Sequence, residues 1–133
     1  MRYIGYFREL NPYYPRVYRD SIHEAIARGA AYPVEQVVRY LESGHPFLDM
    51  MGVERDVVGG AFALPGGSSP LTDGEWTWRE DLSHYVRLYA PALPDEFTAH
   101  VADRGGVVQP MAREELIAAA EVVYADLGYR RAR

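Results

Sequence analysis

The chain has 133 residues, 48% hydrophobic and 25% charged, with a net charge of −5 at pH 7, values typical of one soluble globular domain. It contains no cysteine, which excludes disulfide bonds, thiolate nucleophiles and zinc–thiolate sites. Its 14 basic residues are all arginine, which excludes lysine Schiff-base chemistry and the phosphate-binding lysine of a P-loop.

The first 44 residues predict one short strand followed by two helices. Residues 3–7 (YIGYF) are aromatic and β-branched, as in a strand. Residues 21–24 (SIHE) form a capping-box pattern that opens a helix ending near Arg28. A second helix begins at Pro33 and ends before Gly44. Its apolar stripe consists of Val34, Val37, Val38 and Leu41.

The middle of the chain predicts short strands joined by glycine-rich connections. Residues 45–51 (HPFLDMM) and 56–64 (DVVGGAFAL) are expected to form buried strands, the second interrupted by a bulge or turn at its glycine pair. Residues 65–70 (PGGSSP) are expected to form a loop. Residues 75–78 form either a short strand or an extended approach to the next helix.

The second half of the chain predicts three helices. Residues 77–80 (TWRE) read as a capping box, and the helix that follows ends before Pro91. Pro94 begins the next helix. Residues 112–127 give the clearest helical pattern, followed by a basic tail at residues 129–133 that is expected to fray. The predicted core-facing stripe of this last helix is Leu116, Ile117, Ala120, Val123, Tyr124 and Leu127.

Helices dominate this pattern, and strands do not alternate with them regularly. This favours an α+β fold over a doubly wound sheet. We therefore expect a single compact domain over residues 1–133, with about five helices packed with a small sheet of three or four short strands.

Acidic residues are concentrated between residues 73 and 103. There, seven acids face only Arg79 and Arg87, so this segment carries a charge equal to that of the whole chain. A nucleic-acid-binding protein shows the opposite, a basic stripe. The acids favour a basic protein partner, and a merely solvated acidic face is the alternative. The seven acids are Asp73, Glu75, Glu80, Asp81, Asp95, Glu96 and Asp103.

Trp76 and Trp78 share a face if their segment is extended, and a core-covering role is favoured over an exposed interface anchor. His84 with Asp81, and His100 with its acidic neighbours on the next helix, have the spacing of helix-surface pairs. Such pairs are more often structural than catalytic. No metal-ligand spacing is present, so we expect no metal, no cofactor and no catalytic residue.

A second group of polar residues is expected near the core. His45 and Asp49 lie in an apolar run and predict either an internal hydrogen-bonded network, which is favoured, or the floor of a pocket. The glycine pairs in residues 59–69 form either a tight connection, which is favoured, or an anion cradle made of backbone amides. The candidate pocket residues are His45, Asp49, Asp56, Asp73 and Trp76.

Residues 73–86 follow the pattern D-G-x-W-x-W-x-x-D-L-x-x-Y-V, and residues 93–97 follow L-P-x-E-F. Together they resemble a family of small actinobacterial proteins and segments of immunity proteins that neutralise bacterial toxins. Arg79 stands where the related pattern often has proline. The resemblance implies a shared scaffold, in which the Trp, Leu, Tyr and Pro positions are structural.

The leading hypothesis is a non-enzymatic, immunity-like, cytoplasmic module that lays an acidic, aromatic-edged face over a toxin or other basic protein. Asp81→Arg is then expected to weaken binding while the fold stays intact. The alternative is a small ligand-binding protein or enzyme that uses the glycine-rich loop with His45, Asp49 and Asp73. Association of identical chains through exposed tyrosines is the third hypothesis. No nucleic acid or membrane is expected as a partner. The predicted partner-binding residues are Glu75, Glu80, Asp81, His84, Arg87, Asp95 and Glu96.

Overall fold

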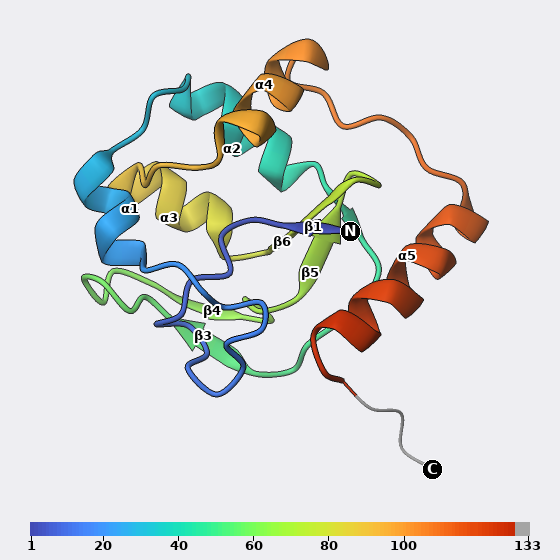
Figure 1. Cartoon of the computed structure of the whole chain (residues 1–133), viewed down its shortest axis with the longest axis horizontal. Coiled ribbons are helices and arrows are strands. Elements are labelled where there is room, and N and C mark those ends of the chain that lie inside the picture. Colours follow the sequence, from blue (N-terminus) through green and yellow to red (C-terminus); the bar gives the residue numbers. More distant parts are fainter. Residues whose placement is uncertain (130–133) are drawn as a thin grey trace.

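The computed structural model of the chain describes residues 1–129, and within them it contains five helices and two small sheets (Figure 1). The α+β class predicted from the sequence is confirmed. Of the predicted frayed tail, residues 130–133 lie outside the described residues. The helices are α1 (Ile22–Arg28), α2 (Val34–Glu42), α3 (Leu82–Tyr89), α4 (Asp95–Asp103) and α5 (Arg113–Asp126). The strands are β1 (Arg2–Tyr3), β2 (His45–Pro46), β3 (Val53–Arg55), β4 (Ala63–Pro65), β5 (Pro70–Thr72) and β6 (Trp76–Arg79). None of the helices in residues 1–129 is long and apolar enough to cross a membrane.

The larger sheet joins the beginning of the chain to its middle. Its strand order is β1-β6-β5-β2, with β1 parallel to β6 and the other neighbours antiparallel. Arg2 lies opposite Trp76, and Leu71 lies opposite Trp78. Strand β6 is an interior strand, and all its residues are buried. Strands β3 and β4 form a separate antiparallel pair.

The main core brings together residues of the larger sheet and of helices α1 to α4. Trp78 is fully buried, and its ring lies 5.8 Å from that of Phe97 between centroids. Its indole N–H donates a hydrogen bond to the carbonyl of Leu41 at 3.0 Å. Trp76 is 3% exposed and also packs against Phe97. Both tryptophans are therefore buried, as the core-covering interpretation predicted.

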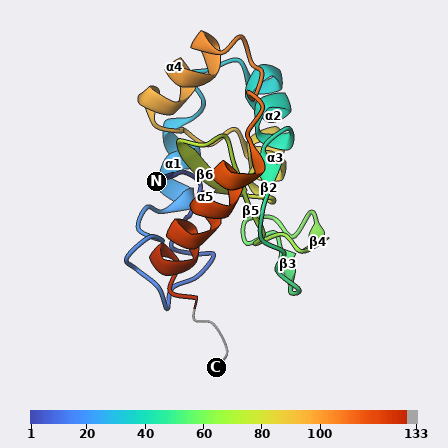
Figure 2. The same cartoon turned by 90° about the vertical axis from the view of Figure 1, so that its right-hand side faces the viewer.

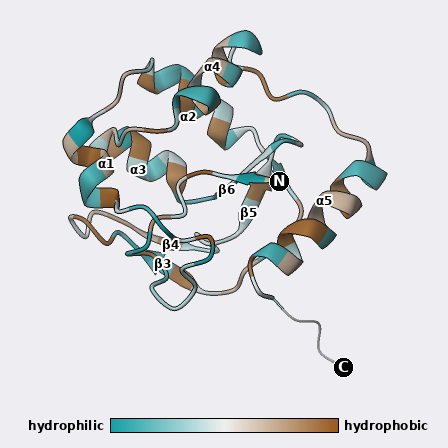
Figure 3. Ribbon diagram, in the orientation of Figure 1, coloured by the Kyte–Doolittle hydropathy of each residue, from teal (hydrophilic) through white to brown (hydrophobic). Residues whose placement is uncertain are grey.

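Helix α5 lies at one side of the molecule (Figures 1 and 2). Val123 and Leu127 pack into a second, smaller core with Tyr6 and Tyr18. Ile117, predicted to face the core, is 51% exposed. The prediction of a fully buried stripe is wrong, because the irregular N-terminal segment covers only the C-terminal part of this helix. Figure 3 shows the hydrophobic residues along α5. Half-buried members of the predicted stripe are Leu116, Ala120 and Tyr124.

The strands are shorter than predicted. Strand β1 ends at Tyr3, because Gly5 has a φ of 71° and its backbone packs directly against Leu82. The predicted strand at residues 45–51 is limited to the two residues of β2. The predicted strand at residues 56–64 is wrong for residues 56–62, which form the connection between β3 and β4. Asp56 holds this connection by accepting hydrogen bonds from the backbone N–H groups of three residues: Val58, Gly59 and Ala61.

Helix beginnings also differ from the capping patterns. Ser21 is the N-cap of α1, but its hydroxyl donates to Glu9, which accepts the Ile22 N–H at 2.8 Å. A glutamate from an earlier segment therefore performs the capping. The TWRE capping box is wrong, because Thr77 is a buried residue of β6 and Asp81 is the N-cap of α3.

Candidate functional site

Asp81, predicted as a partner contact, is buried beside Arg79. Each residue is 1% exposed. The carboxylate of Asp81 accepts hydrogen bonds from Nε and Nη2 of Arg79 at 3.1 and 2.8 Å. The prediction that Asp81 faces outward is wrong, because a buried arginine requires a carboxylate partner to offset its loss of hydration. Asp81→Arg is therefore expected to disrupt the fold.

A buried polar cluster surrounds this pair. Nη2 of Arg79 lies 2.5 Å from Oε1 of Glu54, and Nη1 donates a hydrogen bond to the hydroxyl of Tyr18 at 3.4 Å. Burial raises the pKa of Asp81 to about 6, although Arg79 opposes that change. Burial disfavours the charged guanidinium, but Asp81 raises the pKa of Arg79 overall. With both members of the ion pair fully enclosed, we assign the cluster a structural role.

Glu75 and Glu96 lie on either side of Arg2. The backbone N–H of Arg2 donates to the carbonyl of Glu75 at 3.1 Å. The guanidinium of Arg2 pairs with the carboxylate of Glu96 and lies 3.9 Å over the ring of Trp76. Asp95 precedes Glu96 at the start of α4. The structure therefore brings together three of the predicted partner contacts.

His84 and Arg87 belong to α3, Glu80 lies in the turn between β6 and α3, and their contacts differ from those of Glu75 and Glu96. The ring of His84 packs against that of Phe62 at 5.1 Å between centroids. Arg87 pairs with Glu42 of α2 at 3.2 Å. Glu80 is exposed. The seven predicted contacts therefore do not form one continuous face.

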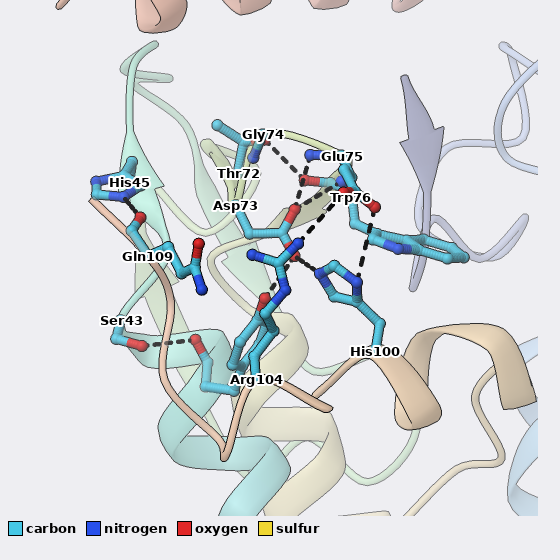
Figure 4. A network of polar contacts seen from close by, with 11 residues as sticks. Ser43, His45, Thr72, Asp73, Gly74, Glu75, Trp76, His100, Arg104 and Gln109 are labelled. Carbon is cyan, nitrogen blue, oxygen red and sulfur yellow. Dashed lines mark hydrogen bonds and ion pairs between the residues drawn. The ribbon is translucent and has the colours of Figure 1, made fainter. Parts of the chain in front are cut away.

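Asp73 fixes the turn between β5 and β6 (Figure 4). Its carboxylate accepts hydrogen bonds from the Tyr40 hydroxyl at 2.6 Å and the Trp76 N–H at 2.7 Å, and lies 3.0 Å from Nε2 of His100. Burial and the contact with Asp73 raise the pKa of Tyr40. Nδ1 of His100 lies 3.7 Å from the Glu75 carboxylate. The network therefore positions Glu75. It also shows that His100 contacts the β5–β6 turn, whereas its helical spacing indicated acidic neighbours on its own helix.

The candidate pocket residues do not converge on one site. His45 contacts the backbone carbonyl of Gln109 at 2.7 Å, near Asp73 (Figure 4). Asp56 is engaged in the β3–β4 connection, where Tyr89 also donates to its carboxylate. Asp49 is exposed, and Trp76 is buried. The internal network predicted for His45 and Asp49 therefore does not include Asp49, and Asp56 and Asp73 belong to two separate hydrogen-bond networks.

The glycine-rich loop is held by its own backbone hydrogen bonds. The N–H groups of Gly66 and Gly67 donate to the carbonyls of Gly52 and Leu64 at 2.8 and 3.1 Å. The N–H of Ser69 donates to Gly66 at 2.9 Å. Because these donors already have acceptors, they are not free to cradle an anion, and the favoured tight-connection interpretation fits them.

An apolar groove of about 550 Å³ lies between α5 and the β5–β6 turn. Residue patterns alone did not indicate it. The available signal was that α5 has more apolar positions than one core-facing stripe needs, among them Val122, which is 45% exposed. The groove is lined by Met1, Arg2, Gly74, Glu75, Met111, Glu115, Ala118, Ala119 and Val122.

Helices α4 and α5 are strongly acidic. Helices α4 and α5 carry seven acids against the single basic residue Arg113, leaving His100 aside. Glu75 and Glu115 lie in the groove lining, and both are exposed. Arg2, the cationic side chain in the lining, is already paired with Glu96, and Glu75 lies 3.4 Å from the guanidinium of Arg104. The groove therefore combines an apolar floor with an excess of carboxylates.

The chain matches no family model, no curated protein sequence and no solved structure. The resemblance of residues 73–97 to immunity proteins stays a prediction from the sequence. The site is therefore interpreted from its own geometry and charge.

Proposed function

We propose that the protein is a non-enzymatic, immunity-like binding module that masks a basic surface of a protein partner. The groove between α5 and the β5–β6 turn receives a basic amphipathic helix of that partner. The observation that carries this proposal is the apolar groove with Glu75 and Glu115 in its lining. A cytoplasmic site of action accords with the cysteine-free sequence.

Charge complementarity selects this occupant. An acidic helix would meet the carboxylates of α4 and α5, whereas lysine and arginine side chains along a helix would pair with them. Exposed pairs of this kind mainly increase the association rate and specificity. Affinity would come from apolar side chains that displace water from the groove floor.

The groove lining can accommodate helices that carry different apolar side chains. Met111 lies in the groove, and methionine side chains adapt to irregular apolar partners because they are unbranched and flexible. Ala118 and Ala119 let another helix approach α5 closely. The network of Asp73 and His100 holds the opposite wall in place, so that little conformational entropy is lost there on binding.

The proposal changes the contact residues expected from the sequence. Glu75 remains a proposed contact residue because it lines the groove. Glu96 does not line the groove, but it pairs with Arg2, which does. Asp81 takes no part, because it is buried. Glu80, His84 and Arg87 lie at a different part of the molecule and are not required.

The direct test is titration with a designed leucine–lysine amphipathic helix, followed by fluorescence anisotropy. We expect one-to-one binding that weakens as salt is added. Val122→Glu, at an exposed position in the groove, should weaken binding at least about tenfold. Val107→Glu is the matched control, since Val107 is 63% exposed and does not line the groove.

Two further peptides sharpen the result. A leucine–glutamate helix of the same pattern should not bind, and a scrambled leucine–lysine peptide without helical periodicity should bind much more weakly. Equal loss of binding in both valine variants, or binding that ignores peptide charge, would overturn the proposal.

A further inference from the structure

A second cavity, of about 440 Å³, lies along the N-terminal segment and shares no lining residue with the groove at α5. Residues 3–7 form one continuous wall of it. Residues 92–95 and the last part of α1 contribute further walls. Its volume is within the range of small-molecule sites in proteins.

The wall formed by residues 3–7 continues an edge strand. In the four-stranded sheet, β1 has β6 as its only neighbouring strand. The N–H groups of Arg2 and Ile4 both donate toward β6, to the carbonyls of Glu75 and Thr77 at 3.1 Å each. Because successive residues of a strand point their N–H groups to opposite sides, that of Tyr3 points away from β6. The chain therefore presents a free backbone edge here.

Three consecutive backbone donors follow on this segment. Within residues 1–129, no group accepts a hydrogen bond from the N–H of Gly5, Tyr6 or Phe7, although all three residues are buried. The φ of 71° at Gly5 takes the chain out of the strand ladder and leaves these donors without strand partners. Buried N–H groups without acceptors are unfavourable, so an acceptor brought by a ligand would stabilise this segment.

The cavity also contains charges of both signs. Arg28, Asp20 and Asp95 all line it, and all three are exposed. Among the described residues, none of these side chains forms an ion pair or a hydrogen bond. Elsewhere on this chain, exposed charges such as Arg87 and Glu42 do pair with each other.

We infer that this cavity binds a zwitterionic ligand of the amino-acid class with an apolar side chain. The ligand carboxylate accepts hydrogen bonds from the free backbone donors and pairs with Arg28. Its ammonium group pairs with Asp20 and Asp95. The apolar side chain packs against Leu93, which also lines the cavity.

A ligand must carry both a negative and a positive charge to pair with all the charged residues of the cavity lining. A phosphate alone would be repelled by two carboxylates, and a simple amine would leave the backbone donors and Arg28 without acceptors. A free amino acid and a dipeptide share the zwitterionic chemistry, and the cavity volume admits either. This inference does not depend on the helix-binding groove.

The test is a titration of ¹⁵N-labelled protein, read from the amide signals of residues 3–7. The probes are leucine and the dipeptide Leu-Leu. Leucinamide, which lacks the carboxylate, and 4-methylpentanoate, which lacks the ammonium group, serve as comparators. We expect saturable shifts of the Gly5, Tyr6 and Phe7 amides with at least one zwitterionic probe. Each comparator should bind at least about tenfold more weakly than the zwitterionic probe that binds more tightly.

Matched variants locate the charged contacts. Arg28→Gln and Asp95→Asn should each weaken leucine or Leu-Leu binding about tenfold, because each removes one ionic contact. Arg39→Gln, an exposed residue of α2 outside the cavity, should leave binding unchanged. The preferred probe, leucine or Leu-Leu, identifies the source of the zwitterion. Dissociation constants above about 1 mM for both probes, or equal binding of the comparators, would overturn the inference.

Discussion

The carboxylate of Asp81 pairs with the guanidinium of Arg79 through two hydrogen bonds, at 3.1 and 2.8 Å, in an environment where each residue is only 1% exposed. The two residues are close neighbours in the chain, at the end of β6 and the start of α3. The pair therefore fixes the direction in which the chain leaves the sheet. Without Arg79, Asp81 would be an uncompensated buried charge, and without Asp81, Arg79 would keep only the partly exposed Glu54 as its ionic partner.

Asp81→Ala should destabilise the protein by about 3–5 kcal/mol, because Arg79 would then lose its enclosed partner. The free energy of unfolding, measured by urea denaturation, checks this. Glu54→Gln should have a smaller effect, since the Glu54 side chain is 30% exposed and solvent takes over part of its role. An effect of Asp81→Ala below that of Glu54→Gln would contradict the buried-pair interpretation.

The same pair gives a pH dependence. Burial raises the pKa of Asp81 to about 6, whereas an aspartate in the unfolded chain titrates at about 3.9. Between these values the folded protein binds more protons, so the stability contributed by Asp81 falls as pH rises through about 6. The urea midpoint of the wild type should therefore fall relative to that of Asp81→Asn, which cannot titrate at this position, as pH rises from about 4 to about 6. A wild-type midpoint that rises relative to the variant over this range would be the opposite result.

Asp56 should show the opposite slope. Burial works against its charged form, but hydrogen bonds from Tyr89 and from three backbone N–H groups hold its pKa below the usual value. The stability contributed by Asp56 is present above the unfolded pKa and is lost as pH falls through the folded pKa. Asp56→Asn should make the free energy of unfolding less dependent on pH in the acid range. It should also speed up amide hydrogen exchange in residues 57–61. Tyr89→Phe, which removes one donor, should bring the pKa of Asp56 closer to its usual value and so weaken this pH dependence.

Substitutions on α5 test its partial exposure. Ile117→Ser should change the free energy of unfolding by less than about 0.5 kcal/mol, because the residue is half exposed. Val123→Ala, in the second core, should cost about 1–3 kcal/mol. Thermal and urea unfolding compare the two directly. A large decrease in the free energy of unfolding of Ile117→Ser would mean that α5 is buried along the whole stripe predicted from the sequence.

Local signals predicted the elements whose partners are close in the chain. Helix α2 begins after Pro33 and has the predicted apolar stripe, and α4 begins after Pro94 as expected. Burial of Trp78 followed from its size and from its position before an amphipathic helix. In each case, spacing and turn residues act over a few positions.

Contacts between distant segments were beyond that reasoning. Glu9 caps α1, and Asp73 accepts hydrogen bonds from Tyr40 of α2 and lies 3.0 Å from His100 of α4. A spacing rule cannot pair such residues, because the fold alone brings them together. The groove was missed for the same reason: a periodic pattern does not say which of its apolar positions remains uncovered. Asp81 was wrongly predicted to be exposed, because helical periodicity considers α3 alone and not its contact with Arg79 of the preceding strand.

The parallel pairing of β1 with β6 also sets an order for folding. The first strand has no neighbour in the sheet until Trp76–Arg79, more than 70 residues further along the chain, have left the ribosome. Contacts that close so long a stretch of chain slow the search for the native state. The N-terminal segment should therefore be among the last parts to become protected during refolding, and a chain truncated before β6 should expose an unpaired, aggregation-prone edge.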